Sequence, residues 1–151
     1  MFKELIELTE SFKKDQGKSC EIPVYVVKKC GVNVNVSKYL IVYIHKDSYR
    51  SIILTIVKEK TTIPRELVRF SSSDEIIRTT IQTFIEGQTW GYHEERIFFC
   101  ETESQAKKKA TELKKQVIKD VRNGLIRAKK ELKRLEQLLL TLKENKNASN
   151  S

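Results

Sequence analysis

Residues 102–146 read TESQAKKKATELKKQVIKDVRNGLIRAKKELKRLEQLLLTLKENK and contain no proline. Apolar side chains recur in this segment at steps of three and four residues, which is the spacing of one face of an α-helix. This apolar stripe consists of Ala106, Ala110, Leu113, Val117, Val121, Leu125, Ala128, Leu132, Leu135, Leu139 and Leu142. The pattern predicts one long amphipathic helix over 102–146, with Thr102 or Ser104 as its N-cap.

The last part of the stripe has the spacing of a coiled coil. From residue 125 onward the steps are 3, 4, 3, 4 and 3, a heptad seam that can pair with a second helix. The candidate helix-pairing residues are Leu125, Leu132, Leu135, Leu139 and Leu142. Two successive steps of four, from 117 to 121 to 125, interrupt this register like a stutter. Gly124 lies in the interruption, so we expect the helix to bend there, or to end in a C-cap and restart.

The helix face opposite the stripe is basic. Its cations form what we call the basic ridge, which consists of Lys108, Lys115, Lys119, Arg122, Lys129, Lys130 and Lys133. From 108 to 133 a helix spans roughly 37 Å, comparable to one turn of duplex nucleic acid. The ridge residues are therefore candidate nucleic-acid-binding residues. A lysine-rich helix face is also an ordinary solvated surface, and that alternative stays open.

The positive charge of the chain is concentrated in its C-terminal third. The chain has 151 residues and a net charge of +9, which points to a polyanionic partner, either nucleic acid or an acidic protein surface. Residues 101–151 hold 14 Lys and Arg against 7 Asp and Glu, while residues 1–100 hold 15 against 13. We expect a compact core over 1–101, the helix over 102–146 as part of the same domain or as a projecting arm, and a disordered polar tail over 147–151.

The first hundred residues contain both helix and strand patterns. Residues 2–15 have a helical apolar face and are followed by Gly17, which is expected to end the helix. Three β-branched segments, 22–29, 32–44 and 49–57, predict an antiparallel meander, and 92–100 predicts a fourth strand after a loop at 88–91. Ser73 is expected to cap a helix over 74–86. The order α-β-β-β-α-β-α predicts an α+β fold with a mostly antiparallel four-stranded sheet, covered by the helices at 2–15 and 74–86.

No motif of a known catalytic or cofactor site is present. The sequence has no glycine-rich phosphate loop, no HExxH and no paired cysteines, so we expect no catalytic residues, no cofactor and no metal. His45 with Asp47 is interpreted as a strand-turn junction, and His93 carries no specific signal. A nuclease-like pairing of Asp47 with Glu59 and Lys60 lacks the acid-x-lysine spacing. The expected state of Cys20, Cys30 and Cys100 is a free thiol.

Two aromatic residues before the last strand are candidates for a contact. Trp90 and Tyr92 could stack on a base or contact a partner protein. The alternative is that Trp90 closes one end of the hydrophobic core. Neither interpretation is favoured by a motif.

These patterns together predict a small, non-enzymatic intracellular binding protein. Its expected partner is nucleic acid or a complex that handles nucleic acid, and a viral accessory factor in the host cytoplasm is one possibility. The alternative is a homo-oligomeric, most simply dimeric, interaction module that pairs through the leucine seam. No apolar run of 18 residues occurs and the first residues lack the layout of a signal peptide, so we expect a cytoplasmic protein without a membrane partner.

Overall fold

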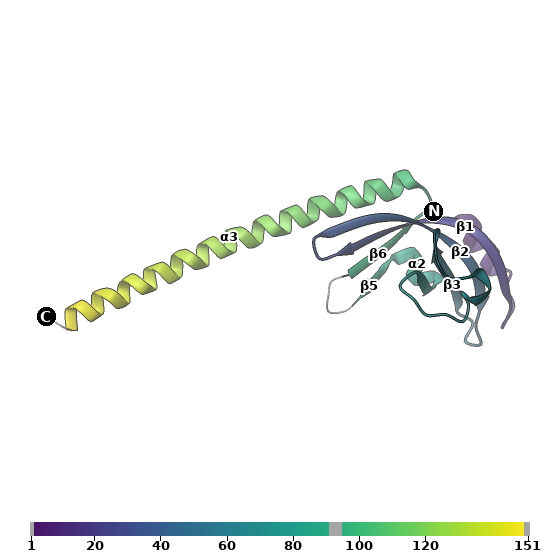
Figure 1. Ribbon diagram of the computed structural model, residues 1–151, viewed down its shortest axis with the longest axis horizontal. Helices are drawn as coiled ribbons and strands as arrows, with labels where there is room; N and C mark the ends of the chain where they lie inside the picture. Colours follow the sequence, from purple (N-terminus) through teal and green to yellow (C-terminus); the bar gives the residue numbers. More distant parts are fainter. Residues whose placement is uncertain (1, 91–94, 150–151) are drawn as a thin grey trace. The chain divides into compact units, whose positions relative to one another are not determined.

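The structure is a computed structural model that describes residues 2–90 and 95–149 (Figure 1). The helices are α1 (Lys3–Glu10), α2 (Ile81–Glu86) and α3 (Glu103–Ser149), with one turn of 3-10 helix, η1 (Arg65–Leu67). The strands are β1 (Gly17–Cys30), β2 (Asn33–Lys46), β3 (Ile52–Lys58), β4 (Ile76–Thr80), β5 (Gln88–Trp90) and β6 (Glu95–Cys100). Residues up to 114 form one compact unit and residues from 115 onward form a second, and the two units are described separately.

The strands form one antiparallel sheet in the order β4-β3-β2-β1-β6-β5. The α+β class and the meander of β1, β2 and β3 are confirmed. The predicted number of four strands is wrong, because the sheet also contains β4 and the three-residue strand β5. Five strands are therefore at least five residues long, and the sixth is a short edge.

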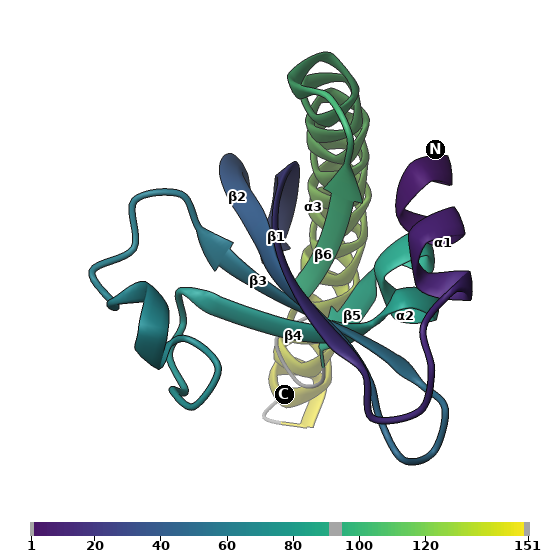
Figure 2. The same ribbon diagram turned by 90° about the vertical axis from the view of Figure 1, so that its right-hand side faces the viewer.

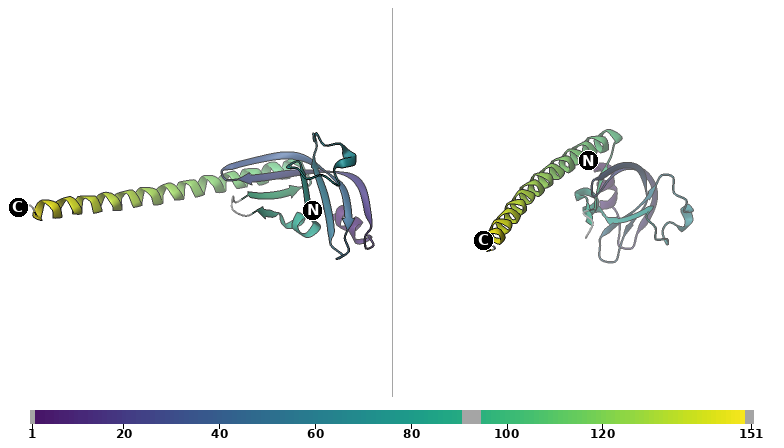
Figure 3. Two further views of the ribbon diagram at one scale, coloured as in Figure 1. Left: turned by 60° about the horizontal axis from the view of Figure 1, so that its bottom comes forward. Right: turned by 60° about the vertical axis from the view of Figure 1, so that its left-hand side comes forward.

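Two β-bulges curl this sheet into a half-barrel. The first places Ser19 opposite Tyr43 but Ile22 opposite Ile41, so β1 contains one extra residue. The second adds one residue to β2 over the same stretch, between Ile41 and Tyr43, where β2 pairs with β3. A bulge bends its strand and increases the local twist, and here both bulges lie beside Val42. The resulting curl is visible in the right-hand view of Figure 3.

The concave face of the sheet holds the main hydrophobic core. Both α1 and α2 cover this face, and they lie side by side in Figure 2. Phe84 of α2 is 1% exposed, and its ring centroid lies 4.6 Å from that of Phe2 and 4.6 Å from that of Phe99. Ile41 and Leu54 are fully buried in the same cluster. The helices at 2–15 and 74–86 were expected to cover both faces of the sheet, and this prediction is wrong, because α1 and α2 pack on the same face.

Other segments cover the convex face. Val68, in the connection between β3 and β4, packs on Val42 and Val57. The first turns of α3 also lie on this face, since the Lys109 ammonium is 4.3 Å from the centroid of the Phe98 ring and Phe98 alternates with core residues of β6. Ala106, Ala110 and Leu113 are buried in these turns. The first three members of the apolar stripe therefore pack within the sheet unit.

Several predicted elements have different bounds. Residues 76–80 form β4 instead of the start of a helix, because this β-branched segment completes the ladder along β3, and Ser73 Oγ accepts from the N–H of Glu75 in a turn. Helix α2 begins only at Ile81, with Thr80 as its N-cap. Helix α1 ends at Glu10, and Gly17 begins β1 instead of ending a helix. Residues 88–90, predicted as a loop, pair with β6, and 92–94 lie outside the described residues.

Helix α3 begins with a reciprocal cap. Thr102 Oγ1 accepts a hydrogen bond from the N–H of Gln105 at 3.2 Å, and Gln105 Oε1 accepts from the N–H of Thr102 at 3.3 Å. The alternative of a C-cap at Gly124 is wrong, because the helix continues through Asn123 and Gly124. It reaches Ser149, so residues 147–149 of the predicted tail are helical. In the described part of the chain, no helix is both long and apolar enough to span a bilayer.

Candidate functional site

The second unit is helix α3 from residue 115 onward, and it is strongly basic. Up to Ser149 it holds 10 Lys and Arg against 4 Asp and Glu. Six ridge residues lie in this unit, and each of their side chains is exposed: Lys115, Lys119, Arg122, Lys129, Lys130 and Lys133. The seventh, Lys108, is exposed in the sheet unit. Because residues 115–133 form continuous helix, the six cations follow one face of it over about 27 Å.

The ridge cations have no carboxylate partner among the described residues. Glu131 binds Arg134 instead, with a shortest N···O distance of 2.7 Å, and these hydrogen bonds raise the pKa of the arginine. Asp120 accepts a hydrogen bond from Gln116 at 2.9 Å. In the first turns of α3, Glu103 pairs with Lys107 at 3.0 Å, and Lys107 is not a ridge residue. Asp120 and Glu131, which lie beside ridge residues in sequence, are thus engaged with side chains outside the ridge.

The apolar side chains of this unit are exposed as well. The predicted pairing leucines, together with Ile118 and Val121, are between 49% and 60% exposed. Ile118 was missed by the sequence analysis because Val117 stands beside it in the stripe. Counting from Ile118, the steps 3, 4, 3, 4, 3, 4 and 3 lead without interruption to Leu142. The seam therefore covers residues 118–142. The apparent stutter between 117 and 125 lies where the stripe of the first turns of α3 gives way to this seam.

Comparison with known proteins gives no relative. No protein-family model matches the sequence, and no curated protein and no solved structure matches the chain. The functional interpretation therefore depends on the chemistry of the residues themselves.

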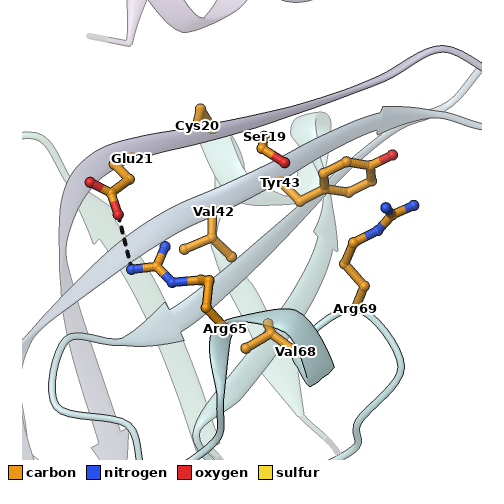
Figure 4. Close-up of a pocket in the computed structure, with 8 residues that line it drawn as sticks. All are labelled: Ser19, Cys20, Glu21, Val42, Tyr43, Arg65, Val68 and Arg69. Atoms are coloured by element: carbon orange, nitrogen blue, oxygen red, sulfur yellow. Dashed lines mark ion pairs between the residues drawn. The ribbon is translucent and has the colours of Figure 1, made fainter.

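A pocket on the convex face is the second candidate region, and no motif in the sequence points to it. It has a volume of about 360 Å³ and lies over the two bulges (Figure 4). The Arg65 guanidinium lies 3.0 Å from the Glu21 carboxylate, and the Arg69 guanidinium lies 4.0 Å from the centroid of the Tyr43 ring. The residues that line the pocket are Ser19, Cys20, Glu21, Val42, Tyr43, Arg65, Val68 and Arg69.

The arginines around this pocket hold the β3–β4 connection on the sheet. Besides the contacts of Arg65 and Arg69, Arg78 of β4 donates to the carbonyl oxygens of Val68 and Ser71 at 2.6 and 2.7 Å. Each of the three contacts joins this connection to a sheet strand. Their arrangement accounts for the position of the connection without a ligand, so the basic ridge remains the stronger candidate.

Among the described residues, the other candidate side chains are engaged in separate local contacts. Asp47 Oδ1 accepts from the N–H groups of Tyr49 and Ser51 at 2.9 and 2.8 Å, so this carboxylate serves the turn after β2. Glu59 pairs with Lys38 at 3.1 Å. The described residues contain no group of three or more His, Cys, Asp or Glu that could hold a metal ion. Trp90 ends β5, while Tyr92 and His93 lie outside the described residues.

Two of the three cysteines lie where burial disfavours the thiolate. Burial raises the pKa of the Cys20 thiol and of the Cys100 thiol, which favours the protonated form of each. The Cys20 thiol donates to the carbonyl oxygen of Ile41 at 3.3 Å. Cys30 is exposed at the end of β1, and no disulfide joins the three.

Proposed function

We propose that this chain is a non-enzymatic binding protein that docks on the phosphates of nucleic acid through the basic ridge. One observation carries the proposal: the six ridge cations between 115 and 133 are exposed and have no carboxylate partner within residues 2–90 and 95–149. A cation in an ion pair must break that pair before it binds phosphate. An unpaired cation instead only exchanges water and counterions, and the release of counterions from nucleic acid favours binding.

The residue types favour binding without strong sequence preference. The ridge is formed by six lysines and one arginine. A lysine ammonium is a point charge that suits phosphate oxygens, whereas arginine is the residue that most often reads guanine with two hydrogen bonds. Contacts to phosphate set position and affinity but carry no base sequence. The proposed activity is therefore electrostatic docking on a nucleic-acid backbone.

Charge reversal at Lys119, Lys130 and Lys133 tests this function. The triple change to Glu should weaken binding of the full chain to a labelled 20-base-pair duplex by at least about tenfold, because three phosphate contacts become repulsive. It should also make the dependence of affinity on salt shallower, as measured by fluorescence anisotropy. Circular dichroism should show an unchanged fold, since these side chains are exposed.

The matched control is charge reversal at Lys14, Lys18 and Lys60, which are exposed in the sheet unit. This control changes the net charge by the same amount, so it should lose much less affinity than the ridge variant. Equal losses would assign binding to net charge and remove the ridge from the account. If wild type binds neither duplex DNA nor duplex RNA at 50 mM salt, the proposal fails and an acidic protein becomes the better candidate partner.

A second candidate function is self-association through the seam. Exposure of seven large apolar side chains at regular heptad positions favours it, because such a surface normally lies against another helix. This candidate can coexist with the first, since Lys119, Lys130 and Lys133 lie away from the seam, whereas Arg122 and Lys129 flank it. A protein can pair through the seam and bind nucleic acid through the ridge.

A further inference from the structure

We propose that two copies of this chain pair through residues 118–142 in antiparallel orientation, which brings both basic ridges to the same face of the pair. The pairing itself requires only the seam, while the consequence for nucleic acid rests on the proposed function. In heptad notation Ile118, Leu125, Leu132 and Leu139 occupy position a, and Val121, Ala128, Leu135 and Leu142 occupy position d. The orientation follows from how these positions meet their counterparts.

Packing of small against large residues favours the antiparallel arrangement. With residue 130 at the centre, each a position faces a d position of the second copy. Ala128 then meets Leu132 of the other chain, and Val121 meets Leu139, so each smaller residue faces a leucine. In a parallel pair, Ala128 meets its own copy and leaves a poorly filled layer, which costs stability.

Gly124 provides a second packing argument. In the antiparallel register, position g of one chain lies beside position g of the other, so that Gly124 of one chain faces Leu138 of the second copy. A Cβ atom built at Gly124 has no neighbour within 4 Å, and the Leu138 side chain is 46% exposed. The site without a side chain thus receives a large one. This assigns a role to a glycine that otherwise only weakens the helix interior.

Charge at the flanking e and g positions does not by itself select the orientation, but it supplies a pair that tests the antiparallel register. Arg122 lies opposite Glu136 of the second copy, and the two-fold symmetry repeats this favourable pair. A parallel arrangement instead places Glu131 beside Glu136, again twice, and like charges at these positions oppose pairing. The antiparallel pair also contains like-charge neighbours, because Lys129 meets its own copy, Glu131 meets its own copy and Lys115 lies opposite Lys143.

The two lysine contacts link pairing to polyanion binding. Ridge residues occupy positions e, b and f, and the e positions of both chains share one face only when the helices are antiparallel. This face presents two basic ridges side by side, at the cost of repulsion between Lys129 and its copy. A phosphate backbone laid along the face neutralises that repulsion. Duplex nucleic acid should therefore strengthen pairing, and pairing should strengthen nucleic-acid binding by the same factor.

Disulfide trapping distinguishes the two orientations. In a full-length background with Cys20→Ser, Cys30→Ser and Cys100→Ala, Val121→Cys and Leu139→Cys are introduced into separate chains that differ in mass. An antiparallel seam brings these two positions together, so mild oxidation of the mixture should give mainly the mixed disulfide dimer, with little cross-linking of either variant alone. Self-cross-linking of each variant alone indicates a parallel pair and overturns the proposal. Absence of any cross-link shows that the seam does not pair, and overturns it as well.

A charge-swap cycle provides the second test and needs no cysteine. Arg122→Glu alone should weaken dimerisation about tenfold, because two favourable pairs become repulsive, and adding Glu136→Arg should restore it. Within one chain these residues are about 21 Å apart, so their coupling can arise only between chains. Sedimentation equilibrium without nucleic acid measures the dissociation constant of the dimer for each variant, and the coupling follows from these values. Independent effects of the two changes contradict the register whether or not the ridge binds nucleic acid.

Discussion

Large apolar side chains are buried in one unit of this chain and exposed in the other. In the sheet unit the large aliphatic and aromatic residues lie in a shared core, with Ile41, Leu54 and Phe84 buried. In the second unit, leucines at regular heptad positions remain half exposed along α3. A single helix has no second layer against which to bury its apolar face. The sheet unit is therefore self-sufficient, whereas the second unit is suited to a partner.

The basic side chains of the two units also differ in whether they have a partner. Arginines of the sheet unit are engaged in holding a connection in place, as with Arg65 on Glu21 and Arg78 on two carbonyl oxygens. The ridge cations of α3 have no such role among the described residues. The core side chains and the arginines named here are thus engaged within the sheet unit, whereas the seam and the ridge remain exposed. We infer that stability belongs to the sheet unit and recognition to α3.

The largest expected effect is in the core of the sheet unit. Phe84→Ala should lower the free energy of unfolding by about 3–5 kcal/mol, because the ring is buried between Phe2 and Phe99. Urea denaturation followed by circular dichroism measures it. Phe70→Ala is the matched control, since Phe70 is 83% exposed and its loss should cost within about 0.5 kcal/mol. Similar effects at both positions would contradict the described core.

The next effect should separate folding from association. Replacing Leu132, Leu135 and Leu139 with Glu should abolish pairing, with at least a roughly 100-fold rise in the dissociation constant, because each buried leucine contributes about 2 kcal/mol. Unfolding of the sheet unit should not change. Light scattering and thermal denaturation measure the two outcomes. Leu140→Glu, outside the seam, should leave the mass unchanged, and an insoluble triple variant would show that the seam packs within its own domain.

The two units differ in how much of their structure could be predicted from the sequence. Helix α3 was predictable because eleven apolar residues keep one period without a proline. The strand at 76–80 could not be predicted, because Ile76, Ile77 and Thr80 fit a helical face as well as a strand. Only the pairing with the open edge of β3 decides between the two. The bulges beside Val42 depend on pairing between distant strands and leave no local pattern.

The candidate site was likewise predicted in part. The ridge followed from helical geometry, and the structure adds the exposure of its residues and the engagement of Asp120 and Glu131 elsewhere. The start of the seam at Ile118 was present in the sequence, but Val117 fits the preceding stripe equally well. The packing of Ala106 and Leu113 shows where that stripe belongs to the sheet unit.

The smallest expected effects compare two glycines, one in each unit. Gly31 has a φ of +59°, whereas Gly124 is helical, and a Cβ meets no atom within 4 Å at either site. Gly31→Ala should destabilise the sheet unit by about 1 kcal/mol through backbone strain. Gly124→Ala should stabilise α3 locally by about as much. Hydrogen exchange should show slower exchange near residue 124 in the second variant, and faster exchange there would contradict a continuous helix.

The most direct test of the account is the salt dependence of nucleic-acid binding by the unmodified full chain. Affinity for a 20-base-pair duplex of DNA is measured by fluorescence anisotropy between 50 and 300 mM salt. With most of the six ridge cations of the second unit on phosphates, a plot of log affinity against log salt should be linear with a slope of about −3 to −5. Absence of binding to both DNA and RNA at 50 mM salt, or a slope near zero, would contradict recognition through the basic ridge.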